Sequence, residues 1–122
     1  MDTVYVARGL ASGLYKIGAT GNVFGRMVTL RRQGIGEGVV LLAAFGGRPR
    51  DERALHRRFA DVLAEGRGRE WFRDDGRIAE WLSGLPSAVR CAVSFPYLPA
   101  SSGRQVRLPT RDDVHAALGV AA

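Results

Sequence analysis

The first twenty residues constrain the fold more than any other part of the chain. Residues 3–8 are rich in β-branched and aromatic side chains and alternate in the manner of a β-strand, and residues 14–19 do so again. Gly9 and Gly13 bound the short segment between them, and a glycine-containing connection of this length joins antiparallel strands. The sequence therefore predicts a β-hairpin at the start of the chain.

The hairpin divides its side chains between two faces. Val6 and Ile17 belong to the apolar face, which we expect to point toward the core. Tyr5 and Lys16 then share the opposite face, where a phenol and an ammonium can polarise each other. Gly18 would let a backbone or a ligand approach that face closely. The alternative is a surface tyrosine beside a solvated lysine.

Further elements follow from apolar spacing and from helix start and stop signals. Three helices and two strands are predicted, the helices at 22–33, 49–65 and 75–84, and the strands at 39–45 and 69–73. Asn22 has a side chain that is typical of a helix N-cap. Gly66 is of the residue type that most often follows the end of a helix.

The composition changes in the last third of the chain. Residues 96–103 are rich in proline, serine and glycine, as in a linker, and residues 111–118 read as a short capped helix. Residues 89–95 alternate like a strand that adds to this sheet or to that of a second subunit. We therefore expect an α/β unit over 1–84 and an extension over 85–122, with a homodimer through the extension as one possibility.

Composition excludes several classes of protein. There is no run of 18 apolar residues, so no membrane span is expected, and the N-terminus lacks the pattern of a secretion signal. A single cysteine, Cys91, excludes a disulfide framework and a cysteine-based zinc site. These features favour a cytoplasmic protein.

The chain is basic, with a formal net charge of +6. The charge is uneven, because residues 48–58 hold five arginines against two acids, a net +3. Such a cluster is typical of contacts with nucleic acid phosphates, although a basic surface can also serve solubility alone. The candidate nucleic-acid-binding residues are Arg48, Arg50, Arg53, Arg57 and Arg58.

Arg26 is a candidate phosphate clamp on the first predicted helix. At about 100° per residue, it lies roughly 40° from Leu30, at the edge of the apolar stripe. We therefore expect packing to hold its guanidinium in place, which suits phosphate binding. The alternative is an arginine that covers the core with its aliphatic stem.

Glu52 is a candidate metal ligand on the second predicted helix. Phe59 and Leu63 fall about 20° on either side of it, so its carboxylate projects from the apolar stripe. A carboxylate there needs a partner, either an arginine or a divalent cation. His56, one turn later, could act as a general acid or base or simply pair with Glu52.

The other segments do not match a known catalytic or phosphate-binding motif. The glycine-rich segment 34–38 is not followed by the Lys-Ser/Thr of a P-loop, and the serines do not form a nucleophile elbow. Trp71, Phe72 and Trp81 are expected in the core, and Glu70 is expected to pair with an arginine.

The order of these residues resembles the GIY-YIG nuclease superfamily. The residues that carry the resemblance are Val4-Tyr5-Val6, Lys16-Ile17-Gly18, Arg26, Glu52 with His56, and Glu70-Trp71-Phe72. The chain is particularly similar to the phage and microbial branch in which Lys-Ile-Gly replaces Tyr-Ile-Gly. The resemblance covers about residues 3–73.

The resemblance implies an α+β fold with a central three-stranded antiparallel sheet flanked by helices, and metal-dependent hydrolysis of phosphodiester bonds. Tyr5 would match the first motif tyrosine, Arg26 the catalytic arginine and Glu52 the ligand of Mg²⁺ or Mn²⁺. Lys16 stands in place of the second motif tyrosine, and the general base is Tyr5, Lys16 or His56. The family's late asparagine has no counterpart here.

We therefore expect a cytoplasmic DNA endonuclease, with RNA as a further possible substrate. In the expected mechanism, Lys16 lowers the pKa of Tyr5 by favouring phenolate. The alternatives are a DNA-binding module without catalysis and an interaction domain whose basic face meets an acidic protein.

Overall fold

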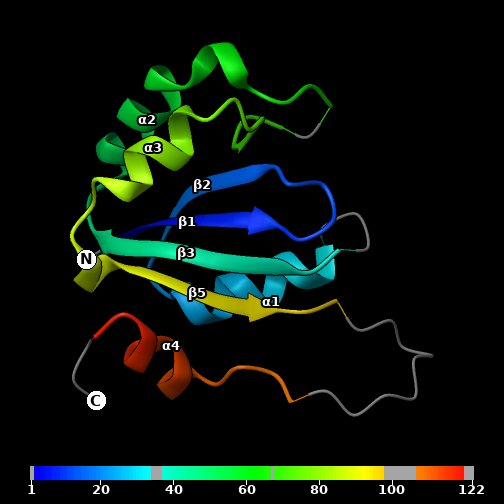
Figure 1. Ribbon diagram of the computed structural model, residues 1–122, viewed down its shortest axis with the longest axis vertical. Helices are drawn as coiled ribbons and strands as arrows, with labels where there is room; N and C mark the ends of the chain where they lie inside the picture. The colour runs from blue at the N-terminus through cyan, green and yellow to red at the C-terminus, as the bar shows by residue number, and fades with distance from the viewer. Residues whose placement is uncertain (1, 34–36, 67, 98–106, 120–122) are drawn as a thin grey trace.

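The computed structural model describes residues 2–33, 37–66, 68–97 and 107–119 (Figure 1). Its helices and strands, in chain order, are β1 (Thr3–Gly9), β2 (Tyr15–Thr20), α1 (Val23–Gln33), β3 (Val39–Gly46), α2 (Pro49–Arg58), the 3₁₀ turn η1 (Ala60–Val62), β4 (Trp71–Phe72), α3 (Arg77–Ser83), the 3₁₀ turn η2 (Ser87–Val89), β5 (Arg90–Phe95) and α4 (Arg111–Ala117).

Five strands form one antiparallel sheet in the described part of the chain, in the order β4-β2-β1-β3-β5. The predicted hairpin is confirmed as β1 and β2, and the predicted buried strand is confirmed as β3. The expected three-stranded sheet was too small, because β4 and β5 extend it at its two edges. The protein is thus a mixed α+β fold.

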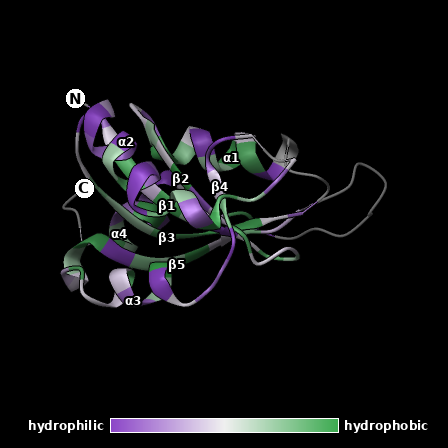
Figure 2. Ribbon diagram, turned by 90° about the horizontal axis from the view of Figure 1, so that it is seen from above, coloured by the Kyte–Doolittle hydropathy of each residue, from purple (hydrophilic) through white to green (hydrophobic). Residues whose placement is uncertain are grey.

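Helices cover both faces of this sheet (Figures 1 and 2). On one face, Met27 of α1 and Val114 of α4 pack in a first buried cluster with Tyr5. On the other face, Phe59 and Ile78 pack in a second cluster around Val6, Ile17 and Phe72. Burial on both faces explains why β3 is apolar along its length rather than alternating.

The second helix is shorter than predicted and ends at Arg58. The chain after it turns back on itself, so that the Ala64 N–H donates to the Trp71 carbonyl (2.8 Å) and the Arg73 N–H donates to the Val62 carbonyl (2.7 Å). These hydrogen bonds between two segments of the same chain occupy backbone groups that a longer helix would have used for its own hydrogen bonds. The glycine expected to stop the helix, Gly66, instead has a positive φ of 78° in the returning turn.

Side chains at or just before the N-cap accept hydrogen bonds at the starts of α1 and α3. The Gly25 N–H donates to the Asn22 side-chain oxygen (3.0 Å), which confirms the predicted start of α1. The Arg77 N–H donates to the Asp75 carboxylate (3.1 Å), so α3 begins two residues after the predicted start at Asp75. The glycine-rich segment after α1 lies mostly outside the described residues.

The C-terminal strand and helix join the same sheet and its core. In β5, Val93 lies opposite Leu41 and Phe95 opposite Val39, so this strand extends the chain's own sheet along β3. Val114 of α4 is buried against the sheet face that α1 also covers. Most of the expected linker lies outside the described residues. No helix within the described ranges is long and apolar enough to cross a membrane.

Candidate active site

Tyr5 and Gly18 define the centre of the candidate site. They lie opposite each other on β1 and β2, and a Cβ built on Gly18 would fall 2.5 Å from the Tyr5 Oη. Only a glycine there lets the phenol lie across β2. Tyr5 shares a face with Lys16, as predicted, but that face is not open surface, because α1 packs over it and Tyr5 is only 1% exposed.

Lys16 forms an ion pair that the sequence did not predict. Its Nζ lies 2.5 Å from the Glu70 Oε2 and 5.5 Å from the centre of the Trp71 ring. The Ile17 N–H also donates to the Glu70 backbone carbonyl (3.0 Å). The expectation that Glu70 pairs with an arginine was therefore wrong, and Glu70 is a site residue that sequence reasoning missed.

Helix α2 brings two further candidate residues to the same edge of the sheet. The His56 Nε2 lies 2.8 Å from the Ile17 carbonyl, and because a carbonyl only accepts, this nitrogen must carry a proton. The same nitrogen lies 3.5 Å from the Glu52 Oε1, one helical turn away. The His56 ring also packs on Phe72, with centroids 5.4 Å apart. These contacts fix α2 against β2.

Glu52 is directed into the site and is hydrogen-bonded to Glu70. Burial raises the pKa of Glu52, the Glu70 charge raises it further, and His56 and Lys16 offset part of this rise. Burial also acts to raise the pKa of Glu70, but the hydrogen bond and charge of Lys16 outweigh burial and lower it. A hydrogen bond between two carboxyl groups requires one proton, and Glu52 is the partner that holds it more readily.

The electrostatics of Tyr5 contradict one expectation. Burial raises the pKa of Tyr5 well above its ordinary value, Glu70 and Glu52 raise it further, and Arg26 offsets part of the rise. The hypothesis that Lys16 favours the phenolate was therefore wrong, because the loss of hydration dominates.

Arg26, on α1, is the positive charge that offsets part of the rise in the pKa of Tyr5. It is exposed, so the expectation that packing holds its guanidinium was wrong. Its charge is nevertheless close enough to influence the ionisation of Tyr5. Glu52 and Glu70 thus lie within electrostatic reach of both Tyr5 and Lys16, beside an exposed guanidinium, although their elements are far apart along the chain.

The five arginines predicted to bind nucleic acid lie on α2 and just before it. All are exposed, and none forms an ion pair with an acidic residue in the described part of the chain, while the Arg58 guanidinium lies over the Phe59 ring (5.4 Å to its centre). The same helix carries Glu52 and His56 on its inner side. The structure therefore places a basic surface next to the candidate site.

A metal would find few protein ligands here. Among the described residues, no group of three or more histidine, cysteine, aspartate or glutamate side chains is arranged to hold a metal. The Glu52–Glu70 pair nevertheless fits a cation, because a cation could replace the proton that the two carboxyl groups require. Mg²⁺ is commonly held by one or two carboxylates, with water and substrate phosphate as its other ligands.

One comparison with known proteins gives a match. The family model described as the T5orf172 domain matches residues 2–89, which span all of the site residues above. Neither the curated proteins nor the solved structures include a significant match.

Proposed function

The chain belongs to the T5orf172 domain family, which is associated with GIY-YIG-like phage proteins, and we propose that it is a metal-dependent endonuclease of the GIY-YIG type acting on DNA. The observation that carries this proposal is the meeting of a phenol, an ammonium, a histidine and two carboxyl groups at one edge of β2, next to exposed arginines. This combination suits the hydrolysis of a phosphodiester.

Arginines bind the substrate backbone in this proposal. The exposed guanidinium of Arg26 lies beside the site, where it neutralises charge that develops on the scissile phosphate. The arginines on the outer side of α2 hold neighbouring phosphates. Such contacts position the strand and carry little sequence information.

Glu52 would hold Mg²⁺ or Mn²⁺ in place of the proton that it shares with Glu70, and Glu70 would remain beside it. When bound, the metal supplies Lewis-acid stabilisation of the phosphate and of the leaving oxygen. Lys16, paired with Glu70, keeps the second carboxylate fixed.

His56 accepts the proton of the attacking water. Its Nε2–H is committed to the Ile17 carbonyl, which leaves Nδ1 as the nitrogen that can accept a proton. Tyr5 keeps its proton, because burial raises its pKa, so its phenol is a hydrogen-bond donor and not the general base. The water oxygen bonds to phosphorus as its proton passes to Nδ1. The bond from phosphorus to the leaving sugar oxygen then breaks, giving a phosphomonoester, and the leaving oxygen takes a proton from solvent water to become a hydroxyl group.

Cleavage of supercoiled plasmid with Mg²⁺ or Mn²⁺ tests this proposal. We expect nicking that stops with chelator and falls at least about 100-fold in Glu52→Ala. Arg90→Ala, which removes an exposed arginine on β5, serves as a charge control that should keep full activity. Full activity of Glu52→Ala would overturn the metal-site assignment, and single-stranded DNA and RNA substrates would show the preferred nucleic acid.

A DNA-binding module without catalysis is the second candidate. It is favoured by the exposed arginines of α2, which could hold DNA without any contribution from the carboxyl pair. It predicts salt-dependent DNA binding that chelator leaves unchanged and no nicking with any metal.

A further inference from the structure

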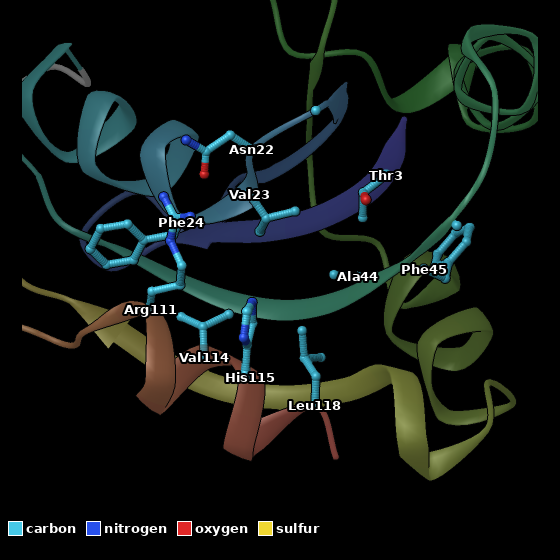
Figure 3. A pocket seen from close by; sticks show the side chains of 12 residues that line it. Thr3, Asn22, Val23, Phe24, Ala44, Phe45, Arg111, Val114, His115 and Leu118 are labelled. Atoms are coloured by element: carbon cyan, nitrogen blue, oxygen red, sulfur yellow. The ribbon is translucent and has the colours of Figure 1, made fainter. Parts of the chain in front are cut away.

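A cavity of about 560 Å³ lies between the start of α1, the ends of β1 and β3, and α4. Figure 3 shows Arg111, Val114, His115 and Leu118 rising from α4 toward α1 and the strands. This volume is within the usual range for sites that bind small molecules. The proposed mechanism does not use this cavity.

The cavity adjoins the candidate active site. On β1, Thr3 lines the cavity and Tyr5 follows it on the same sheet face. Ala44, which also lines the cavity, lies opposite Tyr5 on the side away from Gly18. Tyr5 is therefore flanked by the catalytic centre on one side and by the cavity floor on the other.

The charge of the cavity favours an anion. Arg111 and His115 lie one turn apart on α4, and none of the described residues that line the cavity is acidic. The Arg111 guanidinium lies 5.9 Å from the centre of the Phe24 ring, which contacts the Phe95 ring in turn (6.1 Å between centroids). A guanidinium held over a ring in this way is a good partner for phosphate.

Apart from the side chains of Thr3 and Asn22, the rest of the described lining is apolar or glycine. Val23, Val114 and Leu118 come from the two helices, and Ala44 comes from the strand below them. An occupant that satisfies both parts of the cavity has a flat apolar body joined to an anionic group. A nucleotide has both, and the adjoining site is proposed to act on a chain of nucleotides.

We propose that this cavity is a nucleotide subsite, in which the base packs between α1 and α4 and the phosphate is bound by Arg111 and His115. The choice of a nucleotide rests on the proposed function, whereas the binding of an anion with an apolar body rests on the cavity alone. The nucleotide is either free or part of a bound strand next to the cleavage site.

NMR titration of the full chain with deoxyadenosine monophosphate tests the subsite. We expect shifts of the backbone amide signals of Val23, Ala44 and Val114 on binding. Deoxyadenosine and inorganic phosphate, which each lack half of the ligand, should bind at least about tenfold more weakly. Arg111→Ala should weaken binding of the monophosphate about tenfold and leave binding of deoxyadenosine unchanged.

The controls separate this proposal from the nuclease proposal. Arg90→Ala lowers the net charge equally outside the cavity and should bind the monophosphate normally. Glu52→Gln should also bind it normally, whether or not the protein cleaves DNA. A short single-stranded oligonucleotide that shifts the same signals identifies a strand as the source, and failure to do so identifies the free nucleotide. Absence of cavity shifts with the monophosphate, or equal effects of Arg111→Ala and Arg90→Ala, would overturn the subsite.

Discussion

Glu52 illustrates that a carboxylate placed to bind a cation lowers the stability of the folded protein when no cation is bound. Its side chain is only 15% exposed and lies against a second carboxyl group, Glu70. The pKa of Glu52 is raised in the folded state, so this residue favours folding only while it is protonated. That contribution is lost as the pH rises through the raised pKa.

We therefore predict that Glu52→Gln abolishes cleavage and also stabilises the protein at neutral pH. Glutamine mimics the protonated carboxyl group and can still donate a hydrogen bond to Glu70. The melting temperature should rise by about 2–4 °C, which corresponds to roughly 1 kcal/mol or less. Thermal denaturation followed by circular dichroism measures this change.

The pH dependence gives the control. Near pH 4, at about the ordinary pKa of glutamate, Glu52 is itself protonated, and the gain from glutamine should disappear. A gain that is equal at both pH values would show that repulsion between the carboxylates is not its cause.

Gly18 is the residue whose small size the site requires. We predict that Gly18→Ala lowers cleavage at least about tenfold, because the new Cβ would overlap the Tyr5 hydroxyl, 2.5 Å away, and displace the phenol. Gly46→Ala is the matched control, since nothing lies within 4 Å of a Cβ at that position. Equal activity of the two variants in the plasmid assay would contradict a role for the position of Tyr5.

At the scale of elements, local patterns predicted what depends on local physics. The alternation of 3–8 and 14–19 gave the hairpin, and the side chain of Asn22 gave the start of α1. The end of α2 could not be predicted this way, because the apolar spacing continues through Leu63. The backbone there is instead committed to Trp71 and Arg73, a pairing between distant segments that periodicity does not contain.

The candidate site could be predicted only in part, because residue types are visible in the sequence but contacts between distant segments are not. The residue types of Tyr5, Arg26 and Glu52 marked them as candidates, and the structure brings Arg26 and Glu52 within electrostatic reach of Tyr5. Glu70 was missed because its partner, Lys16, is its neighbour only through the β2–β4 pairing. The burial of Tyr5 was missed because alternation within the hairpin does not reveal that helices cover both faces of the sheet.

Helix α2 is predicted to bind DNA through its outer side. Arg53→Ala and Arg57→Ala should each weaken binding to a duplex and reduce the slope of log affinity against log salt by about 1, because each guanidinium releases roughly one counterion. Fluorescence anisotropy at several salt concentrations measures this slope. Arg77→Ala is the control, because Arg77 is already ion-paired with Asp61 and Asp75 in the folded protein. An equal loss in all three variants would indicate a general effect of charge.

At the scale of the molecule, the two tryptophans report on opposite faces of the sheet. Trp71 belongs to the first buried cluster, and Trp81 packs against the second. Since the strands of one sheet separate the clusters, we expect both faces to unfold in a single transition.

Leu118→Ala tests this coupling. Leu118 is 8% exposed and belongs to the first cluster, so its truncation should cost about 2–4 kcal/mol. Urea unfolding of variants that keep only Trp71 or only Trp81 should show the same lowered midpoint. A shift seen by Trp71 alone would mean that the two faces unfold independently.

The place of α4 in the first cluster has a consequence for the order in which the protein matures during translation. Every proposed catalytic group has been synthesised once Glu70 has left the ribosome, whereas Val114 and Leu118, which belong to the same buried cluster as Tyr5, come more than forty residues later. Until then the nascent chain has a sheet covered by α1 on that face but not yet by α4. We expect a newly made molecule to acquire its activity only once α4 has been synthesised, after all its catalytic side chains already exist.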